Sequence, residues 1–329
     1  MHAGAAIWQP LFIFVCFKFP IVIIHTDFSG FKDLETAVTI GTFDGVHLGH
    51  RAILSRLLRE AQMDGFQSVI LTFYPHPRMV LHPEDHALQL LSTPEEKAEL
   101  LKELGIDHLM VYPFSEEFSR ISAFDYVRNL LVNGLNAKKI IVGYDHRFGR
   151  NREGDFSTLS EWSEILQYKS LEIPAEEIDN VNISSTKIRK YLLDGNVSQA
   201  ATYLGYPYAL TGKIVHGNKM GRTLGFPTAN MSVNYPYKLI PANGVYAVEC
   251  KTEKGSFKGV MNIGVRPTVD STPVRHIEAH LLDFEGDIYG QNLTVRFIQK
   301  IREEKKFGSI DELKNQIHVD VQTTRTLFQ

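Results

Sequence analysis

The amino-acid sequence predicts an α/β domain with a parallel sheet, followed by a small antiparallel β-barrel and a terminal helix. Over residues 21–175, short apolar runs alternate with helical patterns, which is typical of parallel strands covered by helices on both faces. From residue 208 to about 301, short β-rich segments separated by turns replace that alternation, as expected for a closed antiparallel sheet. The length of 329 residues is sufficient for both domains.

The composition is that of a globular protein with a slightly acidic balance. The formal net charge of −3 argues against a protein whose main task is to grip nucleic acid. The two cysteines, Cys16 and Cys250, supply neither a disulfide framework nor a Cys-rich zinc site. We therefore expect a cytoplasmic protein with neither a nucleic acid nor a membrane as partner.

The first twenty residues stand apart from this pattern. Their apolar run is interrupted by Lys18 and Pro20, and no basic residue precedes it as in a signal peptide. It is also too short and interrupted to span a membrane. We expect residues 1–20 to be an extension or mobile tail, residues 21–205 to form the first domain and residues 206–329 the second.

The first domain shows five expected strands, and its helices begin at recognisable caps. Thr93 and Glu96 form a capping box, and Ser122 with Asp125 repeats this arrangement. The expected strands are residues 21–24, 37–40, 68–73, 109–112 and 140–143, and the expected helices begin near residues 49, 93, 122 and 159. Two further helical segments are expected at residues 183–195 and 197–204. At Gly205 the helical pattern gives way to short β-rich segments.

The second domain shows five expected strands and a final helix that begins with a capping box at Ser309. Apolar and polar residues alternate after residue 276, so Glu278 and His280 should share the polar face of one strand. The expected strands are residues 208–215, 244–250, 257–263, 276–283 and 293–298.

A glycine-rich turn follows the strand that ends at Ile40, and a helical pattern begins at about Gly49. His47 and His50 therefore lie beside unpaired backbone N–H groups at the positive end of a helix. Such a place suits a phosphate, which Gly45 and Gly49 would allow the backbone to approach. Alone, the histidines could be polar helix-start residues; in this context they can hold ATP phosphates and stabilise the charge that grows on an attacked α-phosphate.

A charged loop and a hydroxyl-rich helix start add to this turn. Asp145 lies in the loop 142–149, and ligands of parallel sheets bind beyond the carboxyl ends of the strands. One hydroxyl group would suffice to cap a helix, whereas several hydroxyls with two cations fit the β- and γ-phosphates of a nucleotide. The helix start carries Ser184, Ser185, Thr186, Lys187 and Arg189.

The second domain carries a glycine-rich segment, but the chain has no Walker A sequence and is not a P-loop kinase. The segment offers backbone N–H groups for phosphate. Thr228 and Asn230 offer two neutral oxygens for Mg²⁺, which needs few protein ligands when phosphates and water complete its shell. If Glu278 faces this loop, it can act as a general base; a turn-rich loop and a surface glutamate are the alternatives.

Together, these motifs resemble those of bifunctional bacterial riboflavin kinase/FAD synthetases. Residues 41–50, 142–149 and 183–189 are similar to the nucleotide-site motifs of the Rossmann-like nucleotidyltransferase domain in that family. Residues 221–230, with Pro-Thr-Ala-Asn at 227–230, resemble its flavokinase signature. The resemblance runs from about residue 21 to the C-terminus.

The resemblance implies two ATP-dependent reactions in series. The C-terminal domain would phosphorylate riboflavin to FMN with MgATP, and the N-terminal domain would adenylylate FMN to FAD, releasing pyrophosphate. Mg²⁺ would be the cofactor, and the partners would be small molecules; the sequence leaves the oligomeric state open.

The resemblance also implies a role for each matching residue. In the adenylyltransferase domain, His47 and His50 would be catalytic, and ATP would be bound by Gly41, Phe43, Asp44, Gly45, Asp145, Ser184, Ser185, Thr186 and Arg189. In the kinase domain, Glu278 would be the base, and Thr228 and Asn230 would bind Mg²⁺. ATP would be bound there by Gly217, Gly221, Arg222, Gly225 and Pro227, and the flavin by Arg302 and Phe307.

Two other functions are compatible with parts of the sequence. A related nucleotidyltransferase could act on a sugar, choline or pantetheine phosphate beside an accessory β domain, but the Pro-Thr-Ala-Asn loop with Glu278 argues against it. A non-catalytic module could bind RNA or a protein, but the intact histidine pair, Thr228, Asn230 and the acidic balance argue against that.

Overall fold

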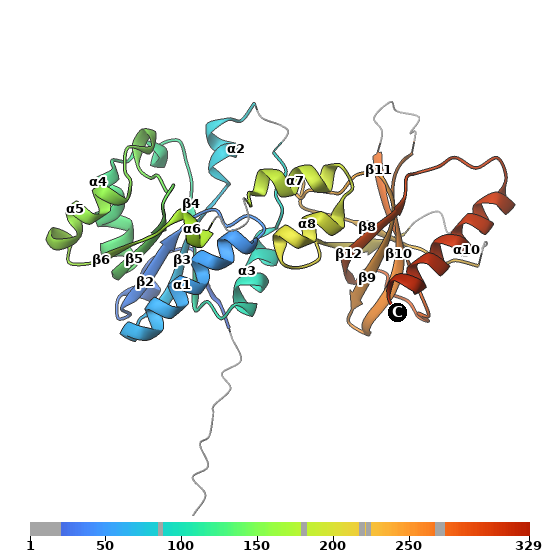
Figure 1. The fold of residues 1–329 in the computed structure, drawn as a ribbon, viewed down its shortest axis with the longest axis horizontal. Coiled ribbons are helices and arrows are strands. Elements are labelled where there is room, and N and C mark those ends of the chain that lie inside the picture. Colours follow the sequence, from blue (N-terminus) through green and yellow to red (C-terminus); the bar gives the residue numbers. More distant parts are fainter. Residues whose placement is uncertain (1–20, 85–87, 179–182, 217–220, 222–224, 267–273) are drawn as a thin grey trace, which may run out of the picture.

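The protein consists of two lobes, one centred on a sheet and the other on a barrel, with a pair of helices between them (Figure 1). The computed structural model describes residues 21–84, 88–178, 183–216, 221, 225–266 and 274–329. None of the helices within these ranges is long and apolar enough to cross a membrane.

The N-terminal lobe contains a parallel six-stranded sheet in the order β1-β4-β3-β2-β5-β6. From β2 the chain extends the sheet in one direction through β3 and β4, and then in the other through β5 and β6. The loops after β2 and β5 therefore lie at a topological switch point, where α/β sheets bind ligands. The strands are β1 (Ile23–His25), β2 (Thr36–Ile40), β3 (Gln67–Tyr74), β4 (His108–Pro113), β5 (Ala137–Gly143) and β6 (Lys169–Ile173).

Helices cover both faces of this sheet. Helices α1 (Leu48–Asp64) and α3 (Pro94–Glu103) share a core with Ala37 of β2. The next residue, Val38, points to the other face and packs with the π-helix Tyr126–Gly134 and with α5 (Phe156–Leu166). Every residue of β2 is buried, as expected for a central strand covered on both sides.

The expected caps are present. Thr93 and Glu96 form a complete capping box, and the Ser122 hydroxyl accepts the N–H of Asp125. The helix after Ser122 is α-helical only over α4 (Ala123–Asp125) and continues as the π-helix. The remaining short pieces of the lobe are α2 (Pro77–Leu81), α6 (Ala175–Ile178) and the 3₁₀ turns Ser29–Phe31, Phe118–Arg120 and Arg150–Arg152.

The C-terminal lobe is a closed barrel in the order β10-β11-β8-β7-β12-β9, with only antiparallel pairs between the described strands. Helix α10 (Ile310–Leu327) lies against its outside (Figure 1). The expected barrel and terminal helix are thus confirmed. The strands are β7 (Ala209–Val215), β8 (Ala229–Ser232), β9 (Gly244–Thr252), β10 (Gly255–Arg266), β11 (Val274–Leu281) and β12 (Asn292–Arg302).

Several short elements are absent from the sequence-based expectation, and one expected strand is displaced. The segments β6, β8, α2 and α6 have only four or five residues each, too few to show a period. The first strand begins at Ile23 rather than at Ile21. The fold class itself is unaffected.

Helices α7 (Ser185–Leu193) and α8 (Val197–Leu204) lie between the two lobes (Figure 1). Their inward side chains, among them Ile188 and Leu204, belong to the same hydrophobic core as the barrel residue Phe297. The helical pair therefore packs against the barrel, and Leu91 of the N-terminal lobe belongs to the same core. The hydroxyl-rich motif at residues 184–189 thus begins a helix that contacts both lobes.

Candidate active sites

The loop between β2 and α1 is held in an unusual backbone conformation. Phe43 and Val46 have φ angles of 45° and 37°, and Gly45 has a φ of 79°. A Cβ atom on Gly45 would lie 2.8 Å from the Leu91 side chain, so only glycine fits there. Left-handed non-glycine residues carry strain that folded proteins retain mainly at functional positions.

His47 and His50 form a stacked pair at the start of α1. Their ring centroids are 3.6 Å apart, and the planes differ by 15°. His47 is the N-cap, and its Nδ1 accepts the backbone N–H of His50 at 3.3 Å. Neutral His47 therefore carries its proton on Nε2.

Burial sets the charge of this pair. It lowers the pKa of His47 to about 4 and the pKa of His50 well below its ordinary value. Both imidazoles are therefore neutral at pH 7, so they stack without like-charge repulsion and can donate N–H groups to a phosphate. Among the described residues, the buried Nδ1 of His50 has no hydrogen-bond partner.

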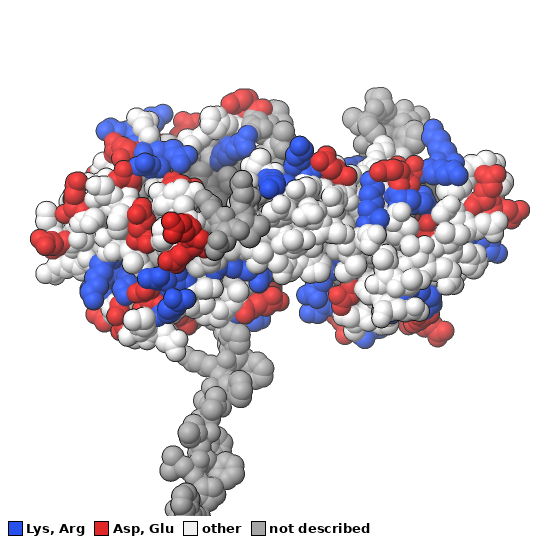
Figure 2. Space-filling model, viewed as in Figure 1, with Lys and Arg blue, Asp and Glu red and all other residues white. Residues whose placement is uncertain are grey.

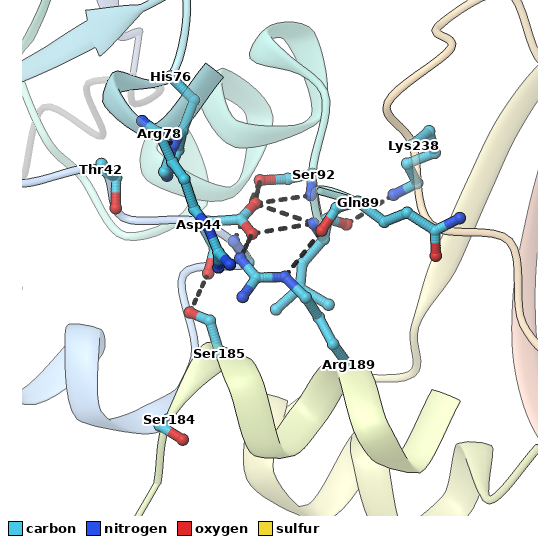
Figure 3. Close-up of polar contacts among 12 residues, drawn as sticks. Thr42, Asp44, His76, Arg78, Gln89, Ser92, Ser184, Ser185, Arg189 and Lys238 are labelled. Atoms are coloured by element: carbon cyan, nitrogen blue, oxygen red, sulfur yellow. Dashed lines mark hydrogen bonds and ion pairs between the residues drawn. The ribbon is translucent and has the colours of Figure 1, made fainter. Parts of the chain in front are cut away.

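Asp44 is the centre of a buried polar network (Figure 3). Its carboxylate accepts the backbone N–H groups of Leu91 at 2.9 Å and of Ser92 at 3.1 Å. Arg189 of α7 donates to the same carboxylate at 2.7 Å, and its Nε donates to the Gln89 carbonyl at 2.7 Å. Asp44 and Arg189 thus join the histidine loop to α7.

The structure brings residues 41–50 and 184–189 together, although each uses some of its polar groups on the other. The Ser185 hydroxyl donates to the Asp44 carbonyl at 3.2 Å, and Ser184 caps α7 by accepting the N–H of Lys187. Ser184 and Thr186 are exposed at this helix start. Direct contact of Asp44, Ser185 and Arg189 with ATP stays a prediction.

The remaining predicted residues of this region lie on the same edge of the sheet. Gly41 follows β2 directly, and a Cβ on it would meet the Phe43 ring at 3.0 Å. Asp145 is exposed in the loop after β5, the strand next to β2. The expected loops thus come together at the switch point.

Two residues of this region were not among the predicted site residues. Lys97 of α3 donates to the Thr42 carbonyl at 2.6 Å, and burial lowers its pKa to about 8. His76, the N-cap of α2, has its pKa lowered by burial to about 4. Both line a recess that Asp44 and Tyr235 also line. A sequence signal for Lys97 does exist. It lies four residues before Leu101, so both side chains are on the same, buried face of α3.

The candidate kinase residues lie on two neighbouring strands. Glu278 of β11 is directly opposite Asn230 of β8. Residues 277, 279 and 281 are buried, and Glu278 and His280 alternate with them as expected. His280 Nδ1 donates to the Pro227 carbonyl at 2.8 Å and so supports the residue before Thr228.

The described part of the glycine-rich segment is compact. The Phe226 N–H donates to the Gly221 carbonyl at 2.8 Å, and a Cβ on Gly221 would lie 2.4 Å from the Phe226 carbonyl. Gly225 is exposed with a φ of 87°. Gly217 and Arg222 lie outside the described residues.

The donor set around Thr228 fits a hard cation such as Mg²⁺. The hydroxyl of Thr228 and the amide oxygen of Asn230 are neutral oxygen ligands beside the carboxylate of Glu278. Within the described ranges, no cluster of three or more His, Cys, Asp or Glu residues could hold a metal. A cation here would depend on phosphate oxygens and water for most of its coordination.

The predicted flavin residues Arg302 and Phe307 lie next to α10. Arg302 forms a bidentate ion pair with the buried Asp320, with distances of 3.0 and 2.8 Å. Its guanidinium carbon lies 5.7 Å from the centroid of the Phe307 ring. Arg302 therefore fixes α10 against β12, and contact with a flavin stays a prediction.

Comparison with known proteins gives a consistent picture. Residues 31–187 match the family model for FAD synthetase, and residues 204–328 match that for riboflavin kinase. The chain is 40% identical over 292 residues to the bifunctional riboflavin kinase/FMN adenylyltransferase of Escherichia coli K12, covering 88% of this chain and 92% of that protein. It is 36% identical over 296 residues to the enzyme of the same name from Listeria monocytogenes, covering 90% and 93%.

A solved structure also resembles the whole chain. It is described as a macrolide-efflux protein from Streptococcus pneumoniae, and it is 31% identical with a TM-score of 0.82. The match covers 93% of this chain and 99% of that one. The arrangement of both lobes is therefore shared with a protein of known structure.

Proposed function

The chain belongs to the bifunctional riboflavin kinase/FMN adenylyltransferase family, and from that premise we propose which of its residues carry out each reaction. The enzyme uses ATP to phosphorylate riboflavin to FMN, and it uses a second ATP to adenylylate FMN to FAD. Both are ATP-dependent transfers.

For the adenylyl transfer, we propose that the stacked histidine pair binds the α-phosphate of ATP. A phosphate oxygen of FMN attacks the α-phosphorus, and the bond to the leaving pyrophosphate breaks. N–H groups of His47 and His50 would stabilise the charge that develops on the non-bridging oxygens. The backbone N–H groups at the start of α7, with Ser184 and Thr186, would hold the leaving phosphates.

The observation that carries this proposal is the neutral, stacked histidine pair at a strained helix start, joined by the Asp44–Arg189 ion pair to a second helix start. Two helix N-termini facing one region supply many backbone N–H donors and little net charge. This suits a polyphosphate that must be bound, attacked and released.

For the kinase reaction, we propose that Glu278 takes the proton from the 5′-hydroxyl of riboflavin. The hydroxyl oxygen then attacks the γ-phosphorus of ATP, and ADP leaves. Thr228 and Asn230 would hold Mg²⁺, which neutralises phosphate charge when it is bound. The register of β8 and β11 supports this assignment, because it sets Glu278 opposite Asn230.

We also propose that residues 21–205 form the adenylyltransferase domain, whose last two helices α7 and α8 pack against the barrel, and that residues 206–329 form the kinase domain. We further propose a cytoplasmic location without a nucleic-acid partner. Cys250 is a buried free thiol, which suits a reducing compartment. On the face shown in Figure 2, acidic and basic side chains are interspersed over both lobes, whereas a nucleic-acid footprint is a basic patch.

One assay tests this function directly. The protein is incubated with riboflavin, ATP and Mg²⁺, and the flavins are followed by chromatography. We expect FMN to appear first and FAD to follow. Unconverted riboflavin would refute both activities, and FMN without FAD would reduce the enzyme to a kinase.

A further inference from the structure

A segment of the kinase lobe is fastened to the adenylyltransferase lobe by backbone hydrogen bonds. The N–H of Leu90 donates to the Tyr237 carbonyl at 2.6 Å, and the N–H of Leu239 donates to the Leu90 carbonyl at 2.9 Å. These bonds form a parallel bridge between Leu90 and Lys238. The two lobes therefore meet at the segment that immediately precedes Leu91 and Ser92.

The side chain of Lys238 is buried at this junction, with 2% of its surface exposed. Its Nζ donates to the Leu91 carbonyl at 2.7 Å and to the Glu96 carboxylate at 2.5 Å. The Tyr208 ring lies 4.5 Å from the same nitrogen. Glu96 also accepts the N–H of Thr93 at 3.0 Å as part of the capping box of α3. Lys238 is therefore bonded to the carboxylate that completes this cap.

Lys238 and Asp44 bind opposite ends of one peptide group. Lys238 donates to the carbonyl of Leu91, and the N–H of the next residue, Ser92, donates to the Asp44 carboxylate. A cation on the carbonyl polarises the peptide and strengthens the N–H as a donor. In Figure 3, Ser92 lies between Asp44 and Lys238, and Arg189 reaches the Asp44 carboxylate from below.

We propose that Lys238, a residue of the kinase lobe, is a positioning residue for FMN adenylylation. It acts through the Leu91–Ser92 peptide on Asp44, and through Asp44 on Arg189 and the histidine loop. The inference rests on the adenylyl-transfer site proposed above. Tyr206 supplies a second connection in the same direction, because its hydroxyl donates to the Gly45 carbonyl at 2.5 Å.

The test compares Lys238→Met with Lys139→Met. Lys139 is also a buried lysine, paired with Glu60 and Asp64, but it lies near the amino end of β5, whereas the histidine loop follows the carboxyl end of the neighbouring strand β2. We expect Lys238→Met to lower kcat/KM for FMN adenylylation about tenfold or more, mainly through a higher KM for ATP. Riboflavin phosphorylation should stay within twofold of the wild type, as should both activities of Lys139→Met.

A double variant separates positioning from general destabilisation. If Lys238 acts through Asp44, Lys238→Met should have little further effect on adenylylation in an Asp44→Asn background. If the fold-losses in kcat/KM for adenylylation of the two single variants multiply in the double variant, the proposal is overturned. If Lys238→Met does not fold, as judged by lost kinase activity, Lys238→Gln replaces it, because it removes the cation from the Leu91 carbonyl while keeping a side-chain donor, and it should lower adenylylation in the same direction.

The outcomes distinguish the two levels of inference. A wild-type protein that makes no FAD from FMN would refute the proposed adenylyltransferase site. A wild type that makes FAD, with a folded Lys238 variant as active in adenylylation as Lys139→Met, would refute the role of Lys238 alone.

Discussion

The two candidate sites of this enzyme are built in different ways. In the kinase site, Glu278 and Asn230 face each other because their strands are hydrogen-bonded neighbours. In the adenylyltransferase site, Asp44 and Arg189 are 145 positions apart in the sequence, one in the loop before α1 and the other on α7. Backbone pairing places the first set, whereas buried side-chain contacts between lobes place the second.

This difference predicts different responses to substitution. The Glu278 side chain can be replaced without displacing Asn230, because the barrel strands keep their register. The adenylyltransferase site should lose activity also through residues that contact no substrate, because its loop is positioned by buried polar contacts.

The largest effect is expected for Glu278→Gln. Loss of a general base costs ~10²–10⁴-fold in rate, so riboflavin phosphorylation should fall by that factor. Conversion of FMN to FAD should be unchanged, as measured by chromatography with FMN as the starting flavin. Loss of both activities in a folded variant would show that the sites are not independent.

In the adenylyltransferase site, the buried His47 should make the stability of the protein strongly dependent on pH. The pKa of His47 is 6.5 in the unfolded chain and about 4 in the folded one, so the unfolded state binds the proton first as the pH falls. Unfolding free energy is therefore lost between pH 6.5 and 4, by up to about 3 kcal/mol for this residue.

His47→Asn removes that titration and keeps a good N-cap. The variant should lose less unfolding free energy than the wild type between these pH values, as measured by denaturant titration. An identical pH dependence of both proteins would show that His47 is not buried in its neutral form. His76 and His146 keep their own contributions in both proteins.

A smaller effect is expected for His280→Ala. This substitution removes the N–H donor to the Pro227 carbonyl and should loosen Thr228, so KM for MgATP in the kinase reaction should rise about tenfold or less. His280→Gln, which retains a donor, should restore part of the loss. An unchanged KM in the alanine variant would show that strand pairing alone holds this loop.

The same contrast explains what the sequence could predict. Alternating patterns and caps were enough for the parallel sheet, the barrel and the position of His47 at a helix start, since these depend on local periodicity. The Asp44–Arg189 ion pair and the hydrogen bond from Lys238 to the Leu91 carbonyl join segments that are distant in the sequence. Such contacts leave no periodic pattern in the sequence from which they could be predicted. The packing of α7 and α8 against the barrel also depends on such contacts and has no signal in the local sequence pattern.

The central claim is that two separate sites work in series, and His50→Ala tests it most directly. This variant is incubated with riboflavin, ATP and Mg²⁺ while the flavins are followed over time. We expect FMN to accumulate at the wild-type rate with almost no FAD. FAD formation at the wild-type rate, or loss of FMN formation in the folded variant, would contradict the claim.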